Sequence, residues 1–276
     1  MTHSILAPGK INLGLHVLRV RPDGFRDIDT VFLRIPWCDE VTWTAGPART
    51  MSNSDPALPT DGSNLCMAAA LAFTRAMGVE DGFHLHLDKR VPYGAGLGSG
   101  SSDAAAVLRM MSSVHGGESE LPRLAAGLGS DVPFFLGPPA ARGTGRGEVL
   151  SPLEGYACPF SLVVAVPQVH VPTGPAYALV SPSERPRPDL AEAVTSNDLE
   201  RWRAELANEF QAPVESEWPA IGVARKRLVD LGADYAAMSG SGSAVFGVFE
   251  SEARAKAAAH ALAAEGCRTW SGLPDR

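Results

Sequence analysis

The sequence lacks the features that mark several classes of protein. Its 276 residues carry 24 basic and 31 acidic side chains, a net charge of −7, so it has no basic excess of the kind that binds nucleic acid. No apolar run approaches the roughly 18 residues of a membrane helix, and residues 1–10 contain none of signal-peptide length. Its four cysteines form no C-x-x-C pair, which argues against zinc and redox motifs. We therefore expect a cytoplasmic protein with neither nucleic-acid nor membrane partners.

The hydrophobicity pattern predicts a mixed α+β chain. Strand spacing occurs at 11–20, 30–35, 40–44, 82–87, 162–166, 235–238 and 244–249, and helical spacing at 64–77, 121–128, 189–206, 218–231 and 252–265. Residues 45–60 favour a loop, and the proline-rich stretch 182–188 is typical of a linker or exposed loop. Because a new strand-led unit begins after Pro152, we predict two domains, at 1–150 and 151–276.

The sharpest local signal is a run of four glycines that alternate over seven residues, 94–100, and lead into an alanine-rich helix. Glycine permits positive φ and close backbone approach, so successive N–H groups can point into one concavity. The helix start adds free donors and the positive end of its dipole, which suits phosphate. The loop is not a Walker A motif, because no lysine follows it. The alternative is a flexible loop before a helix capped by Ser101 or Ser102.

Two charged residues stand beside apolar runs. Lys10 precedes a strand that is otherwise apolar, where it can lie near a substrate hydroxyl and a transferred phosphate. Asp131 is followed by four apolar residues, and a partly buried carboxylate usually has a partner, often a lysine. Its role would be to orient or accept the proton of an attacking hydroxyl. The alternatives are an ordinary exposed lysine and an aspartate that caps a turn beginning at Val132.

A second glycine turn, 238–243, joins two predicted strands with three serines and two glycines. It would hold a substrate or close around phosphates. A plain hairpin turn is the alternative.

These motifs, in this order, resemble those of the GHMP kinase superfamily, which includes galactokinase, homoserine kinase and mevalonate kinase. They are the lysine motif at 7–13, the Pro-x-x-x-Gly-Leu-Gly-Ser-x-Ser-Ser loop at 92–102 and the Gly-Ser-Gly motif at 238–243. The resemblance implies a two-domain α+β fold, with an N-terminal domain like ribosomal S5 domain 2 and a ferredoxin-like C-terminal domain. It also implies phosphoryl transfer from ATP, with Mg²⁺, to a metabolite hydroxyl.

Within the superfamily, nearly the whole chain is similar to one branch. The matching segments are 10–13, 21–30, 129–135, 145–148, 172–173, 208–210 and 238–243. The reaction implied is phosphorylation of the 2-hydroxyl of a methylerythritol that carries a cytidine diphosphate group. This reaction is a step of non-mevalonate isoprenoid and terpenoid biosynthesis.

The resemblance also implies site residues. Lys10 and Asp131 would be the catalytic pair, in which Lys10 holds Asp131 ionised and stabilises developing negative charge. ATP would be cradled by Pro92, Tyr93, Gly94, Ala95, Gly96, Leu97, Gly98, Ser99, Gly100, Ser101 and Ser102. The substrate would contact Asn12, Phe25, Arg26, Thr173 and Tyr177. The metal ligands stay open, with Ser101, Ser102 and Asp103 as candidates, and we expect a monomer or a weak homodimer.

One position departs from the family pattern, which usually reads Asp-Gly-Tyr-His where this chain has Asp-Gly-Phe25-Arg26. Phe25 can still stack on a cytosine. Arg26 is a donor only and always charged, so a contact through a histidine side chain would be lost.

Two other functions compete with this interpretation. The chain could be a different GHMP kinase, of the homoserine or mevalonate type, but stretch 21–30 argues against that. It could instead be a GHMP-fold binding protein without catalysis. Such a protein should have a damaged lysine, loop or aspartate, and all three are intact here.

Overall fold

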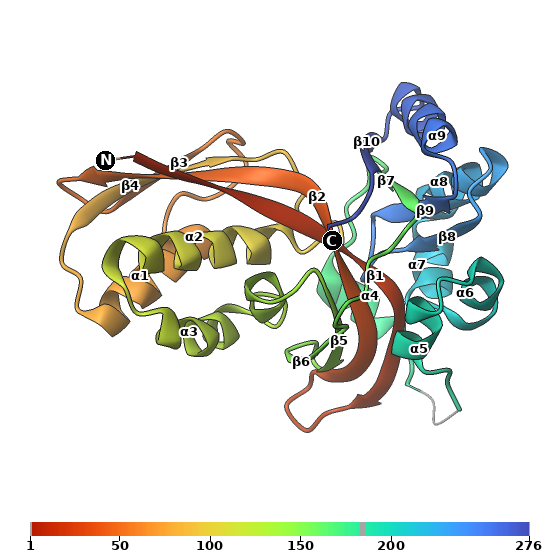
Figure 1. Ribbon diagram of the computed structural model, residues 1–276, viewed down its shortest axis with the longest axis horizontal. Helices are drawn as coiled ribbons and strands as arrows, with labels where there is room; N and C mark the ends of the chain where they lie inside the picture. Colours follow the sequence, from red (N-terminus) through yellow and green to blue (C-terminus); the bar gives the residue numbers. More distant parts are fainter. Residues whose placement is uncertain (1, 183–185, 276) are drawn as a thin grey trace. The chain divides into compact units, whose positions relative to one another are not determined.

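The computed structural model describes residues 2–182 and 186–275, which form two compact units (Figure 1). Unit 1 comprises Met1–Gly9, Trp37–Val91 and Gly98–Gly137, and unit 2 comprises Lys10–Pro36, Pro92–Leu97 and Pro138–Arg276. Two long paired strands, β1 (Thr2–Val20) and β2 (Arg26–Gly46), contribute residues to both units. The domain boundary near residue 150 stays a prediction. Within the described residues, no helix is both long and apolar enough to cross a membrane.

In unit 1, three helices cover one face of a sheet (Figure 1). The elements are β3 (Thr50–Asn53), α1 (Leu65–Met77), β4 (Gly82–Asp88), α2 (Ser99–His115), η1 (Glu118–Glu120), α3 (Leu121–Leu128) and η2 (Pro133–Leu136). Strand β4 pairs antiparallel with the second half of β2 and parallel with β3. The side chains of β4 alternate as predicted: Phe83, Leu85 and Leu87 are buried, while His84 and His86, which bond Ser52 of β3, point to the opposite face.

Unit 2 holds the first half of β2 and a second sheet. Its elements are β5 (Ala140–Gly145), β6 (Val149–Pro152), β7 (Ser161–Val166), α4 (Thr173–Ala178), α5 (Leu190–Thr195), α6 (Leu199–Glu205), α7 (Gln211–Glu217), α8 (Pro219–Asp230), β8 (Tyr235–Met238), β9 (Val245–Phe249), α9 (Glu252–Ala264) and β10 (Arg268–Gly272). Strand β5 pairs with β2 and β6, and the second sheet has the antiparallel order β10-β7-β9-β8. Helices α8 and α9 pack against the second sheet, and the core between them includes Val163, Leu228 and Leu262.

Two local predictions differ from the structure, and a third is only partly covered by it. The loop predicted at 45–60 contains the short strand β3, which pairs along β4. The helix predicted at 189–206 is two helices, because Asn197 adopts the left-handed conformation at φ 52° and ends α5. The linker predicted at 182–188 lies partly outside the described residues, which leave out 183–185.

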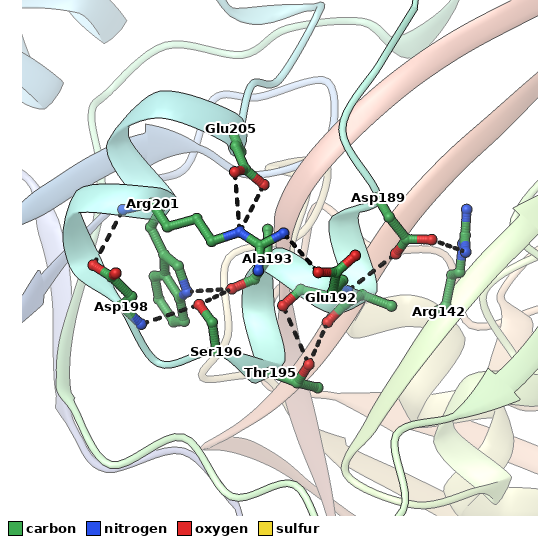
Figure 2. Close-up of polar contacts among 11 residues, drawn as sticks. Arg142, Asp189, Glu192, Ala193, Thr195, Ser196, Asp198, Arg201 and Glu205 are labelled. Atoms are coloured by element: carbon green, nitrogen blue, oxygen red, sulfur yellow. Dashed lines mark hydrogen bonds and ion pairs between the residues drawn. The ribbon is translucent and has the colours of Figure 1, made fainter.

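Helices α5 and α6 are held together by polar contacts (Figure 2). The Trp202 indole N–H donates to the Ala193 carbonyl at 2.9 Å, and the Arg201 guanidinium contacts both Glu192 and Glu205. Asp189 caps α5 and also accepts a hydrogen bond from Arg142 of β5 at 3.0 Å. This ties the start of α5 to strand β5.

Candidate active site

Lys10 lies in β1 and is almost fully buried, with 4% of its surface exposed. Its ammonium donates to Asn12 Oδ1 at 2.7 Å and to the Gly96 carbonyl at 3.0 Å, and it lies 5.3 Å from the centre of the Phe32 ring. These three contacts are with neutral groups, and they orient the ammonium. Burial beside fixed dipoles makes such a cation effective at stabilising developing negative charge.

The first half of the glycine loop lies against the Gly-Ser turn at 239–243. The Ser239 hydroxyl donates to the Gly96 carbonyl at 2.9 Å, and the Ala244 N–H donates to the Ala95 carbonyl at 2.9 Å. Gly96 has φ +81°, and a Cβ there would overlap the Ser239 carbonyl oxygen. The loop and the turn therefore approach each other as closely as only glycine allows.

Asn12 connects these parts to β2. Its side-chain N–H donates to Thr30 Oγ1 at 2.9 Å, which fixes the amide so that its oxygen faces the Lys10 ammonium. The Thr30 hydroxyl in turn donates to the Gly14 carbonyl at 2.6 Å. The Asn12 backbone N–H donates to Ser239 Oγ at 3.2 Å. The predicted residues Lys10, Asn12 and Gly96 are thus brought together in unit 2.

The second half of the glycine loop opens α2 in unit 1. Gly98 is the N-cap, in the left-handed conformation with φ 67°. Within the described part of the chain, the hydroxyls of Ser99 and Ser102 are buried and have no hydrogen-bond partner. Buried hydroxyls usually have partners, so these two are unsatisfied polar groups at a helix start, where free N–H groups favour an anionic ligand.

Asp103 belongs to a buried cluster of two carboxyl groups and one ammonium group. The Lys89 ammonium donates to Asp103 Oδ2 and to Asp39 Oδ2, each at 2.6 Å, and all three side chains are at most 3% exposed. Asp39 Oδ1 accepts the backbone N–H groups of Arg90 and Val91, directly before the glycine loop. Burial raises the pKa of Asp103 to about 8 against the opposing charge of Lys89. Lys89 engages Oδ2 of Asp103, whereas Oδ1 is buried without a hydrogen-bond partner among residues 2–182 and 186–275, and the role of Asp103 as a magnesium ligand stays a prediction.

The cluster makes stability depend on pH. In the unfolded chain Asp103 loses its proton near its ordinary pKa of 3.8, whereas in the folded protein it holds the proton up to about pH 8. The folded state binds more protons between these values, so the stability of the wild type falls as pH rises through this window. We expect Asp103→Asn to be the more stable protein, with the difference in unfolding free energy widening by roughly 2–4 kcal/mol between pH 5 and pH 8.

Urea unfolding of both proteins across this pH range is the measurement. Asp39→Asn is the control, because it replaces the oxygen that accepts from the Lys89 ammonium by an NH2 donor, while Oδ1 can still accept the two backbone N–H groups, and it should destabilise. A variant Asp103→Asn less stable than wild type at every pH would mean that Asp103 is ionised and contributes as a salt bridge.

The predicted substrate residue Phe25 lies in the turn between β1 and β2, and Arg26 is the first residue of β2. The Phe25 ring is 54% exposed, and the guanidinium carbon of Arg146 lies 4.8 Å from its centre. Arg26 is half-buried and donates to the Gly24 carbonyl at 3.4 Å. The guanidinium lies over one face of this partly exposed ring, and an aromatic ring and a guanidinium plane are both groups on which a flat base can stack.

The predicted residues Thr173 and Tyr177 lie on α4 in unit 2. Thr173 is exposed at the start of the helix, while Tyr177 is half-buried with its ring 4.7 Å from that of Phe210. Asp131 lies in unit 1, half-buried in the turn before η2. Its pairing with Lys10 stays a prediction.

Unit 2 also has a cavity of about 550 Å³. Its lining includes Arg203, Gln211, Tyr235 and Arg254. Neither Lys10 nor any residue of the glycine loop lines it. The candidate active site at Lys10 and the glycine loop is therefore separate from this cavity.

Comparison with known proteins agrees with this geometry. Residues 64–137 match the family model of the GHMP kinase N-terminal domain, and residues 190–268 match that of the GHMP kinase C-terminal domain. A 4-diphosphocytidyl-2-C-methyl-D-erythritol kinase of Salinibacter ruber is 51% identical over 271 residues, covering 95% of each chain. This chain belongs to the GHMP kinase family.

Solved structures agree with this membership. The crystal structure of a 4-(cytidine 5'-diphospho)-2C-methyl-D-erythritol kinase superposes with a TM-score of 0.85 at 36% identity, covering 99% of this GHMP kinase and all of the other chain. A homoserine kinase from Cytophaga hutchinsonii has a TM-score of 0.70 at 18% identity over 99% and 94% of the two chains, which shows the common fold alone. The predicted fold class and family are confirmed.

The structure of this GHMP kinase adds residues that the sequence analysis did not assign to the site. Ser239 lies in the Gly-Ser turn that was singled out, but its bond to Gly96 could not be read from the sequence. Thr30 ends the matched segment 21–30 and Phe32 lies just beyond it in β2, but neither was assigned a role in the site. Arg146 belongs to a segment matched to the family, yet nothing in the sequence placed it beside Phe25.

Proposed function

We propose that this chain is an ATP-dependent kinase that phosphorylates the 2-hydroxyl of 4-diphosphocytidyl-2-C-methyl-D-erythritol. The observation that carries the proposal is the match at 51% identity, along nearly the full length of both chains, to a kinase named for this substrate. The reaction would serve isoprenoid precursor biosynthesis by the non-mevalonate route. The lysine, glycine loop and aspartate are intact, which favours a catalyst over a binding protein.

In the proposed reaction, the substrate hydroxyl oxygen attacks the γ-phosphorus of ATP and the bond to the β-phosphate oxygen breaks, releasing ADP. Asp131 would accept or orient the hydroxyl proton. Lys10, oriented by Asn12 and by the Gly96 carbonyl, would stabilise the charge that develops on the transferred group. The phosphates would meet the unpaired hydroxyls and free N–H groups at the start of α2.

A magnesium ion would accompany the nucleotide. Among the described residues no group of three His, Cys, Asp or Glu side chains could hold a metal ion. This suits an ion carried mainly on the phosphate oxygens and its own waters, as is usual for Mg²⁺ in kinases. When bound, the ion would neutralise charge on the phosphates.

The cytosine of the substrate would stack on Phe25, with Arg146 beside it. Asn12, Arg26, Thr173 and Tyr177 stay proposed substrate contacts. Asn12 already bonds Lys10 and Thr30, so a substrate contact would share this carboxamide with the ammonium.

The proposal predicts turnover that depends on both the cytidine diphosphate group and the methylerythritol. ADP release would be measured with 4-diphosphocytidyl-2-C-methylerythritol, homoserine and mevalonate as acceptors. We expect the first to be used at least about a hundred times more efficiently, because a site built for polar groups rejects analogues that lack them. Faster turnover of homoserine or mevalonate would limit the assignment to the GHMP family.

A further inference from the structure

The segment after α6 lies beside the lysine strand. The Leu15 N–H donates to the Ala207 carbonyl and the Glu209 N–H donates to the Leu15 carbonyl, both at 2.9 Å, so residues 207–209 run parallel to β1. This pairing places Asn208, which is 8% exposed, on the same strand edge of unit 2 that carries Lys10.

The carboxamide of Asn208 is fully used. Its Nδ2 donates to the carbonyls of Met238 and Gly240, each at 2.8 Å, and its Oδ1 accepts the Phe210 N–H at 2.9 Å. The bond from Phe210 fixes which end of the amide is the oxygen, so both carbonyls of the turn face a donor. No other standard side chain of this size offers two N–H donors and one oxygen acceptor in this geometry.

The turn that Asn208 holds carries Ser239, and Ser239 contacts the glycine loop. The Ser239 hydroxyl and the Lys10 ammonium donate to the same acceptor, the Gly96 carbonyl, at 2.9 and 3.0 Å. A shift of the turn would therefore move or unpair the carbonyl that orients Lys10. One continuous set of hydrogen bonds leads from Asn208 to the ammonium.

We propose that Asn208 is a positioning residue for phosphoryl transfer, which sets the place of the Lys10 ammonium through the Ser239 turn and the Gly96 carbonyl. The inference rests on the proposed kinase function for its kinetic consequence. Misplacement of a catalytic group by about 1 Å can cost on the order of a hundred-fold in rate. For Asn208→Ala and Asn208→Asp we expect kcat to fall about ten- to a hundred-fold, with a smaller change in the KM of the acceptor.

A matched control separates positioning from loss of stability. Tyr235 is equally buried at 7%, and its hydroxyl donates to the Leu206 carbonyl at 2.9 Å without touching the turn. Tyr235→Phe removes one buried hydrogen bond from the same region and should leave kcat within about two-fold. Urea unfolding gives the stability of each variant, and Asn208→Asp keeps the shape of the side chain in case Asn208→Ala folds poorly.

Hydrogen exchange gives a readout that needs no turnover. The N–H groups of Lys10 and Ala244 donate to the Leu97 and Ala95 carbonyls at 2.9 Å, so they report on the loop directly. Peptides holding these amides should exchange faster in the Asn208 variants than in Tyr235→Phe. Equal exchange, or unchanged kcat in folded Asn208 variants, overturns the positioning role. If the wild type does not turn over the cytidine substrate, the proposed function is contradicted. Hydrogen exchange then still tests the positioning role of Asn208, because it needs no turnover.

Discussion

Asp131→Asn is expected to bind ATP and acceptor nearly as the wild type does and to lose most turnover. Asparagine preserves the shape of the side chain, but it cannot accept a proton and carries no charge. A positioned acid or base contributes roughly a hundred- to ten-thousand-fold, so kcat should fall by about that factor. Lys10→Met should cost a similar amount, because it removes the buried ammonium while filling most of its volume.

The two changes together should be scarcely worse than either alone, since residues that act as a unit are strongly non-additive. The measurement is single-turnover kinetics at saturating ATP for the two single variants and the double variant, after circular dichroism confirms folding. Near-normal rates for Asp131→Asn would contradict the proton-acceptor role and leave positioning and electrostatics to carry phosphoryl transfer. Near-normal rates for both single variants would mean that the active site is elsewhere.

Replacing Gly96 by alanine is the second change for which we expect a large effect. The new Cβ would overlap the Ser239 carbonyl oxygen and lie 3.3 Å from the Gly242 carbonyl oxygen. Both obstacles are backbone, so the loop must move away from the turn, and the Gly96 carbonyl then no longer meets Ser239 and Lys10. We expect kcat/KM for ATP to fall by about a hundred-fold or more.

Gly78→Ala is the matched control for backbone strain. Gly78 ends α1 with φ 66°, and a Cβ there would meet nothing within 4 Å. Both substitutions carry the cost of about 1 kcal/mol for a left-handed alanine, but only Gly96→Ala should weaken nucleotide use. An unchanged nucleotide titration for folded Gly96→Ala would place ATP away from the glycine loop.

Some of the site could be predicted because its causes are local. Four alternating glycines followed by serines at a helix start give positive φ and free N–H groups wherever the chain folds, and Gly94, Gly96 and Gly98 do adopt φ between 65° and 81°. The alternation of Phe83, Leu85 and Leu87 also describes one strand with one buried face. Helical spacing, however, continues through a single left-handed residue, so the break at Asn197 left no periodic signal.

The sequence by itself determined the glycine loop at the start of α2, the apolar strand that follows Lys10, and the order of motifs that identifies the family. Only the tertiary structure decided that Asn208 holds the Met238–Gly240 turn, 30 residues further along the chain. It likewise decided that Lys89 lies between Asp39 and Asp103, which are 50 residues before it and 14 after it. The physical reason is that a hydrogen bond between distant residues depends on strand pairing and helix packing, which bring together side chains that no local spacing connects.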